Sequence, residues 1–373
     1  MVGSHHAARE LARRGWRVLL LVDPASTAHM LAAPLNQSAL ARLNNARVGA
    51  STLQEGLQAL TPMTMMPLAG RFGANFSFAL RHWMALTFPS LQTFLRQAGF
   101  SSPDLMMLDG ALYAPLVRHL RPRRSVLRLF DWPDGAVRHP AALRAAEVEL
   151  AKTVDAVAIS APGLGTVARN WGARAVVEFF NGVDIEHFST PHAEPEIYGP
   201  IRQPRIVYMG AIAPWIDVRM MQSVATRMPD CQFIWIGSGV KAPSLRGPNI
   251  HMIGATPYAA LPALLQHAQV GIIPFDTIEH RALVDCVNPL KLYEYAAAGL
   301  PVVATATRAL QAVGSPALLA EGTEAFVDGI RHALADSKAP NAMRAFAQHH
   351  DWSRRVDGLL ASIGLKEWPN LAE

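Results

Sequence analysis

Residues 287–308 read VNPLKLYEYAAAGLPVVATATR, which combines a short helix, a glycine stop and an apolar strand. Asn288 suits the N-cap of the helix and Pro289 its first position. The glycine at 299 ends the helix, and PVVAT at 301–305 has the continuous apolar character of a strand buried on both faces. A helix start of this kind presents free N–H groups and a partial positive charge to an anion.

Lys291 and Glu294 lie three positions apart on this helix and therefore share one face. Lys291 adds a full positive charge beside the anion site, and the carboxylate of Glu294 can accept two hydrogen bonds from vicinal hydroxyls such as those of a ribose. Taken alone, the pair equally describes a solvated surface ion pair. The apolar runs on both sides, 270–275 and 301–305, favour a place at the carboxyl ends of strands and hence a nucleotide diphosphate site.

The same rhythm of short apolar runs and helical segments extends over the whole chain. The expected strands of the first half are 18–22, 104–108, 125–130, 156–160 and 175–180, and those of the second half are 205–212, 231–239, 249–255, 270–275, 301–305 and 317–321. Continuous apolar runs of this length are typical of parallel strands covered by helices on both faces. We therefore predict an α/β chain of two doubly wound, Rossmann-like domains facing a cleft.

Composition shifts divide the chain. We predict an acceptor-binding domain over 1–188, a linker rich in proline over 189–204, a nucleotide-sugar-binding domain over 205–345, and over 346–373 a helix that packs back toward the first domain. The chain opens with a helix where an α/β domain normally opens with a strand, so the first strand of the first domain is predicted to be missing.

Composition also narrows the function. The 373 residues are 50% apolar and 17% charged, enough for large cores, and the net charge of +5 favours anionic partners. Cys231 and Cys286 form neither a disulfide framework nor a metal set, which predicts a reducing, cytoplasmic location. No apolar run reaches the length of a membrane-spanning helix, and no nucleic-acid-binding module is recognised.

Several motifs in this order resemble the donor-binding domain of glycosyltransferases with the two-domain GT-B fold, closest to the family-4-like group (glycosyltransferase group 1). The similar segments are RIVYMGAIAPWIDVRMM (205–221), CQFIWIGSG (231–239), NIHMIGATPYAALPALLQHAQVGIIPF (249–275) and NPLKLYEYAAAGLPVVAT (288–305). FFNGVDIEHF (179–188) resembles the segment that closes the first domain. The pattern with a lysine in this helix also resembles that of a group of exopolysaccharide glucuronosyltransferases.

The resemblance implies roles for individual residues. Glu294 would bind the donor ribose and Lys291 the diphosphate, and the donor would be a UDP-sugar. Gly210 and Gly237, with Gly239 beside them, would let the backbone approach the phosphates. Ile253 and Gly254 would offer backbone groups to the base. Tyr258 would stack near the base, although a tyrosine at an ordinary helix start is an equal alternative. The resemblance implies no metal ion and no cofactor.

One position departs from the family pattern. Retaining members carry a second glutamate eight positions before the ribose-binding one, and here that position is Cys286, with Asp285 beside it. The choice between retention and inversion is therefore open. An inverting enzyme needs a general base, and Asp131 and Asp134 follow the strand at 125–130, though both also suit a turn. Asp109 is a weaker candidate.

His5 and His6 are expected to be solvated at the start of the first helix. The arginines at 121, 123, 124 and 128 form a basic cluster, which is either a solubilising loop or, with the apolar segments at 63–67 and 78–95, a surface for an anionic bilayer and a lipid-linked acceptor.

Together these features predict a glycosyltransferase of the EC 2.4 class that adds a sugar to a polysaccharide or lipid-linked acceptor in cell-surface glycan synthesis. Two alternatives are a sugar-nucleotide epimerase of the same fold and a non-catalytic subunit that binds nucleotide or glycan.

Overall fold

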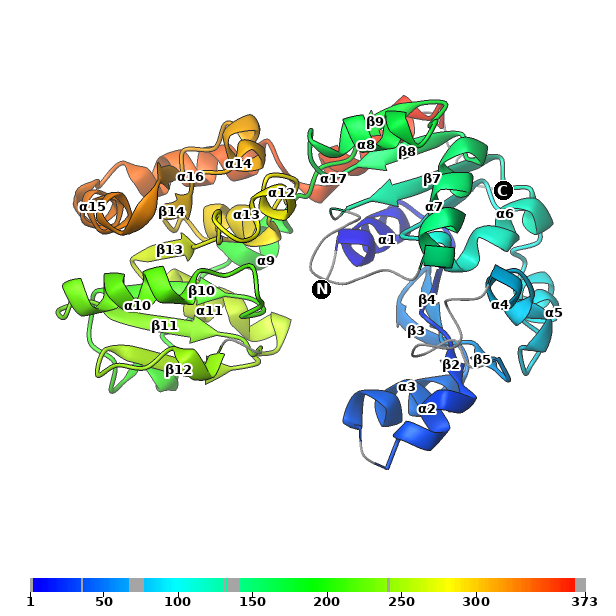
Figure 1. The fold of residues 1–373 in the computed structure, drawn as a ribbon, viewed down its shortest axis with the longest axis horizontal. Coiled ribbons are helices and arrows are strands. Elements are labelled where there is room, and N and C mark those ends of the chain that lie inside the picture. Colours follow the sequence, from blue (N-terminus) through cyan, green and yellow to red (C-terminus); the bar gives the residue numbers. More distant parts are fainter. Residues whose placement is uncertain are drawn as a thin grey trace.

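The computed structural model describes residues 3–34, 36–66, 77–130, 132, 141–239 and 242–365. It has two α/β bodies, one built around β10–β15 and the other around β1–β9 (Figure 1). Every strand expected from the sequence is present, and the predicted fold class is confirmed.

The second body is a six-stranded parallel sheet with the order β12-β11-β10-β13-β14-β15. Its strands are β10 (Arg205–Met209), β11 (Gln232–Ile236), β12 (Ile250–Gly254), β13 (Val270–Ile273), β14 (Val302–Thr305) and β15 (Leu318–Ala320). Its helices are α9 (Ile185–Ser189), α10 (Val218–Arg227), α11 (Leu261–Gln266), α12 (Arg281–Val284), α13 (Leu290–Ala297), α14 (Arg308–Val313), α15 (Gly322–Ala335) and α16 (Ala339–Gln348). The strand order reverses between the neighbours β10 and β13, where open α/β sheets bind ligands.

The first body contains a four-stranded parallel sheet, β6-β7-β8-β9, and a separate three-stranded sheet, β1-β4-β3. The strands are β1 (Val18–Leu21), β2 (Ala25–Ser26), β3 (Ser51–Gln54), β4 (Leu57–Leu60), β5 (Met63–Thr64), β6 (Leu105–Leu108), β7 (Arg124–Leu129), β8 (Ala156–Ile159) and β9 (Val176–Glu178). The helices are α1 (Gly3–Arg13), α2 (Thr27–Ala32), α3 (Gln37–Val48), α4 (Ser77–His82), α5 (Leu91–Gln97), α6 (Ala114–Leu120), α7 (Ala141–Thr153) and α8 (Leu164–Asn170).

The sequence analysis missed β3 and β4, which form an antiparallel hairpin through Glu55 and Gly56. Polar residues interrupt both strands, whose sequences are STLQ and LQAL, and β3 is exposed or half-exposed throughout, so no continuous apolar run marks them. The apolar segment at 63–67 begins with the short strand β5, which pairs with β2.

The chain crosses between the bodies twice, and the two crossings lie side by side. Val183 N–H donates to the carbonyl of His350 at 3.0 Å, and Trp352 N–H donates to the carbonyl of Val183 at 3.2 Å. After the second crossing, α17 (Trp352–Ser362) packs on α1 and β9, beside β8 and β9 in Figure 1.

The stretch 189–204, expected to be a linker, is exposed at most positions and is anchored on the second body by one aromatic side chain. The ring of Tyr198 is fully buried there, and its hydroxyl donates to the carbonyl of Leu264 at 2.9 Å. The guanidinium of Arg205 lies 4.5 Å from the centre of the same ring. A buried aromatic anchor of this kind outweighs the flexibility that the prolines suggested.

Asn288 is not the N-cap of α13. The helix begins at Leu290, so Pro289 takes the cap position, and Asn288 joins the two bodies. Its amide donates to the carbonyl of Ser160 at 3.0 Å and accepts the Tyr293 hydroxyl at 2.9 Å. Its backbone carbonyl accepts the side chain of Asn181 at 2.6 Å.

Replacing Asn288 with alanine removes the amide that satisfies two buried groups. We expect Asn288→Ala to lower the free energy of unfolding by about 2–3 kcal/mol, because the Tyr293 hydroxyl and the Ser160 carbonyl lose their partner. Differential scanning calorimetry measures the change, and the exposed Asn341→Ala is the control. Equal melting of both variants would contradict the bridging role.

Candidate functional site

The candidate site lies where α13 begins, between β13 and β14, next to the point at which the strand order reverses. The helix points its first residues toward the carboxyl end of β10. A Cβ added to Gly210, directly after β10, would lie 3.2 Å from the ammonium nitrogen of Lys291. Lys291 and the loop after β10 therefore lie close together; their role in binding a diphosphate stays a prediction.

Lys291 is held by aromatic residues. Its ammonium donates to the Tyr208 hydroxyl at 3.0 Å and lies 4.3 Å from the centre of that ring and 5.9 Å from that of Phe275. The Tyr208 hydroxyl donates in turn to the carbonyl of Ala211 at 2.7 Å, which leaves its oxygen free to accept. Burial lowers the pKa of Lys291 to about 8, and Glu294 acts in the opposite direction.

Glu294 is buried, with 8% of its surface exposed. Burial raises the pKa of its carboxyl to about 7, against the influence of Lys291. Within the part of the chain that the structure describes, this carboxylate accepts no hydrogen bond. An unpartnered buried carboxylate is costly in a folded protein and is expected where a ligand supplies the donors.

The glycines after β10 and β11 bring two loops into backbone contact. Gly237 has φ +143°, and a Cβ there would lie 2.0 Å from the carbonyl oxygen of Gly210. Gly239 stands in the same relation to the carbonyl of Ile212, at 2.4 Å. The glycine at 237 is therefore required by loop-on-loop packing, which sets the shape of the surface in front of Lys291.

The residues expected to contact the base lie at the carboxyl end of the edge strand β12. Ile253 and Gly254 are half-exposed, and Gly254 has φ +84° with open space where a Cβ would be. Tyr258 stacks on His187, with ring centres 4.5 Å apart and planes 11° apart, and its hydroxyl is buried without a hydrogen-bond partner in the described chain. One face of Tyr258 is thus already occupied by a protein ring.

Two residues of the first body, His6 and Arg128, are buried where the sequence predicted exposure. His6 is not solvated: it is buried and stacks on Trp352 with ring centres 5.2 Å apart, and burial lowers its pKa to about 4. Asp109, after β6, lies 3.7 Å from the guanidinium of Arg128. Arg128 is buried and donates to Asn181, so it does not belong to an exposed basic cluster.

Cys286 and Asp285 do not offer a replacement for the absent glutamate. Cys286 is buried against the core of the first body, close to Gly163, and burial raises its pKa to about 11. The Asp285 carboxylate accepts the backbone N–H of Arg308 at 2.9 Å and lies 3.8 Å from Arg281. Cys286 therefore takes part in packing between the two bodies, and the Asp285 carboxylate binds residues at the ends of helices. Asp131 and Asp134 lie outside the described residues, so their predicted role stays a prediction.

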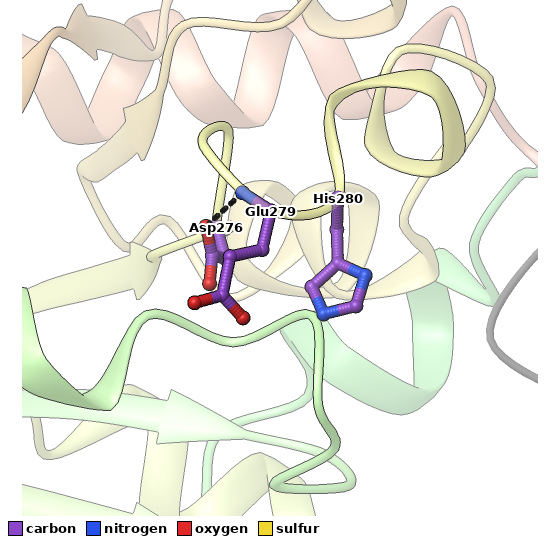
Figure 2. A group of neighbouring side chains, drawn as sticks. All are labelled: Asp276, Glu279 and His280. Carbon is purple, nitrogen blue, oxygen red and sulfur yellow. Dashed lines mark hydrogen bonds between the residues drawn. The ribbon is translucent and has the colours of Figure 1, made fainter.

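A cluster that the sequence analysis missed follows β13. The side chains of Asp276, Glu279 and His280 gather on one loop, with one potential ligand atom from each within 4.8 Å of the others (Figure 2). Asp276 accepts the backbone N–H groups of Ile278 and Glu279, both at 3.0 Å. Because these hydrogen bonds give the Asp276 carboxylate a role in stabilising the turn, we assign no metal to the cluster.

Two other contributors, Tyr208 and Asn181, were also missed. Tyr208 carries a detectable signal, because its hydroxyl is the one side-chain polar group in the stretch 206–209 of β10. Asn181 carries none, since its role depends on the contact between the two bodies.

Comparison with known proteins agrees with this geometry. Residues 203–336 match the model of the family described as glycosyl transferases group 1. The matched residues include most of the second body. TuaH of Bacillus subtilis strain 168, named as a glycosyltransferase of teichuronic acid biosynthesis, is 32% identical over 135 residues, which are 34% of this chain and 33% of TuaH. The aligned region thus spans about a third of that relative.

Solved structures show that the fold extends over both bodies. Sucrose-phosphate synthase of Thermosynechococcus elongatus is similar with a TM-score of 0.65 at 15% identity, covering 97% of this chain and 90% of the synthase. HepE of Anabaena, solved with UDP and glucose, is similar with a TM-score of 0.65 at 15% identity, covering 94% and 99%. The two-domain GT-B fold predicted from the motifs is confirmed.

The glycine at 237 provides a test of the loop packing. We expect Gly237→Ala to destabilise the protein by about 2 kcal/mol or more, because a Cβ collides with a backbone carbonyl at a positive φ. The exposed Gly358, inside α17 with no atom near its Cβ position, is the control, and Gly358→Ala is expected to stabilise by about 1 kcal/mol. Denaturant unfolding measures both. A tolerated Gly237→Ala would mean that the two loops do not touch.

Proposed function

We propose that the chain is a glycosyltransferase that transfers a sugar from a nucleotide diphosphate donor to an acceptor held against the first body. One observation carries the proposal: Lys291, a partly desolvated ammonium, and Glu294, a buried carboxylate with no hydrogen-bond partner among the described residues, share one helix face at the switch point of the sheet. The ammonium suits a diphosphate, and the carboxylate suits the two hydroxyls of the attached ribose.

The same arrangement suits the departure of the nucleotide. As the bond between the sugar and the β-phosphate breaks, negative charge grows on the diphosphate. Lys291 is held in place by Tyr208, and it lies in the first turn of α13, where the helix dipole also favours negative charge. A fixed charge in a site that excludes water stabilises such a transition state better than one in solvent.

UDP is the nucleotide we propose. Support comes from structural neighbours that were solved with it: HepE of Anabaena with UDP-glucose, and GtfA of pneumococcus with UDP and GlcNAc. The acceptor we propose is a cell-surface glycan or its lipid-linked precursor, by the likeness of about a third of this chain to TuaH. We keep Asp131 or Asp134 as the proposed general base because of their position in the sequence. Among the described residues, Asp109 at the end of β6 is the alternative.

A lipid-linked acceptor is consistent with an apolar surface on the first body. Phe78, Leu86, Phe88 and Met65 are exposed by 45% or more, and backbone hydrogen bonds join 63–65 to 86–88. The surface does not include Arg124, which is hydrogen-bonded to the end of α17, or the buried Arg128. We propose a peripheral contact with a bilayer through these side chains. Among the described residues, no helix is long and apolar enough to cross a membrane.

Calorimetric titration with UDP, GDP and ADP tests the donor site. We expect UDP to bind, Lys291→Met to weaken it by about tenfold to a hundredfold, and Glu294→Gln by about tenfold, from the loss of charge-assisted hydrogen bonds. Glu294→Gln should not lower the melting temperature at pH 8, because it removes a buried charge.

Lys338→Met and Glu321→Gln are matched controls on exposed positions of the same body, and both should bind UDP normally. Failure of all three nucleotides to bind a folded protein would overturn the donor-site assignment. If UDP binds, incubation of UDP-sugars with and without glycan acceptors separates transfer from epimerisation of the donor. Binding without either reaction would favour the non-catalytic alternative.

The pH dependence of UDP binding follows from the Lys291 ammonium. Its pKa is about 8 in the free protein, and a bound diphosphate favours the charged form, so affinity must fall as the pH rises through that value. Between pH 7.5 and 9 we expect the dissociation constant to rise by about fourfold to eightfold from this one group, for a rise of the Lys291 pKa by one unit or more on binding. Lys291→Arg, which stays charged, should show a nearly flat profile over the same range. Parallel profiles for both proteins would rule out Lys291 as the titrating group.

A further inference from the structure

The ring of Tyr258, which follows β12, is enclosed by aromatic residues from both bodies. His187 of α9 stacks on it with ring centres 4.5 Å apart, and Phe188 meets it at 88° with ring centres 5.6 Å apart. His6 of the first body lies 5.6 Å from the same ring, centre to centre. The Tyr258 carbonyl also lies 3.1 Å from Nε2 of His187. These contacts fix the ring and therefore the direction in which its hydroxyl points.

The Tyr258 hydroxyl differs from every other tyrosine hydroxyl of the chain. It is buried and has no hydrogen-bond partner among the described residues. The chain has six tyrosines, and the other five hydroxyls each bind a protein group: those of Tyr113, Tyr198, Tyr208, Tyr293 and Tyr295. Because buried polar groups are normally paired, the Tyr258 hydroxyl indicates a bound water molecule or a ligand group.

Glu294 is a second buried polar group without a hydrogen-bond partner among the described residues, and it lies in the same region. Tyr258 stacks on α9, and α9 packs on α13, the helix that carries Glu294. Burial raises the pKa of the Tyr258 hydroxyl, and among charged groups Glu294 acts on it most strongly, in the same direction. A donor that lacks an acceptor therefore lies near an acceptor that lacks a donor.

The chemistry of the two groups restricts what can satisfy both. A phosphate or carbonyl oxygen can accept from Tyr258 but has no hydrogen to give to Glu294, and an amide nitrogen can donate but cannot accept. A hydroxyl group does both, because it has one hydrogen and two lone pairs. Water meets this requirement in the free protein. A sugar hydroxyl meets it in a complex and can take the place of that water with the same hydrogen bonds.

We propose that Tyr258 and Glu294 hold one hydroxyl of the donor ribose between them. The Tyr258 hydroxyl donates to the ribose oxygen, and the hydrogen of the ribose hydroxyl is donated to the Glu294 carboxylate. This role rests on the proposed function, in which Glu294 binds the ribose, and it gives Tyr258 a polar contact in place of stacking on the base. A nucleotide without that hydroxyl leaves two buried groups unpaired, so the pair selects ribonucleotides against deoxyribonucleotides.

Calorimetric titration of wild type and Tyr258→Phe with UDP, 2′-deoxy-UDP and 3′-deoxy-UDP tests the bridge. We expect Tyr258→Phe to weaken UDP by about fivefold to twentyfold, from the loss of one buried hydrogen bond. One of the two deoxynucleotides should bind wild type about tenfold or more weakly than UDP does. For that nucleotide, Tyr258→Phe should cause little further loss, because the contact that it removes is already absent.

Tyr198→Phe is the matched control, since it removes the same atom from another tyrosine of the second body. The Tyr198 hydroxyl donates to the carbonyl of Leu264 at 2.9 Å, so this variant should melt at a lower temperature and bind UDP as wild type does. Tyr258→Phe should not lower the melting temperature, because its hydroxyl has no partner among the described residues.

The results separate this role from the donor site itself. Unchanged UDP affinity in Tyr258→Phe, or an equal loss for UDP and both deoxynucleotides, would overturn the bridge even where wild type binds UDP and Glu294→Gln weakens it. Equal binding of all three nucleotides to wild type would overturn it without any variant. Failure of wild type to bind UDP would remove the donor site and this role together.

Discussion

The donor site depends on one charged group, the Lys291 ammonium, which is held in apolar surroundings. Lys291 reaches across the switch point of the second sheet, where Tyr208 accepts one of its hydrogens and two aromatic rings surround it. Burial makes its ammonium easier to deprotonate and makes the carboxyl of Glu294 harder to ionise. The two groups stay poorly solvated in the free protein, and a ligand with phosphates and hydroxyls satisfies both at once.

The rest of the second body keeps that pair in position. The buried strands β10 and β13 place the loop after Met209 beside α13, and Gly237 lets the neighbouring loop pack against it without side chains. Asn288 and Asn181 tie the start of α13 to the first body. The start of the helix that carries Lys291 is therefore held by both bodies.

Local signals predicted much of this arrangement. Continuous apolar runs gave the parallel strands, and the spacing of Lys291 and Glu294 gave one shared helix face. Contacts between distant segments could not be predicted from local sequence. Asn288 was predicted to be an N-cap because asparagine before proline usually is one. The carbonyl that its amide binds lies in the other body. His6 was judged solvated for the same reason, since Trp352 covers it from 346 positions away. The half-exposed β3 lacks the apolar pattern that marks a strand.

The ionisation of Lys291 with and without UDP tests the central claim most directly. The chain has only five lysines, so nuclear magnetic resonance of selectively labelled side chains can follow each one, with Lys291→Arg identifying the signal. We predict a midpoint near pH 8 in the free protein, as burial requires, and a rise by one unit or more when UDP is bound. A midpoint that UDP leaves unchanged would show that the diphosphate does not lie beside this ammonium.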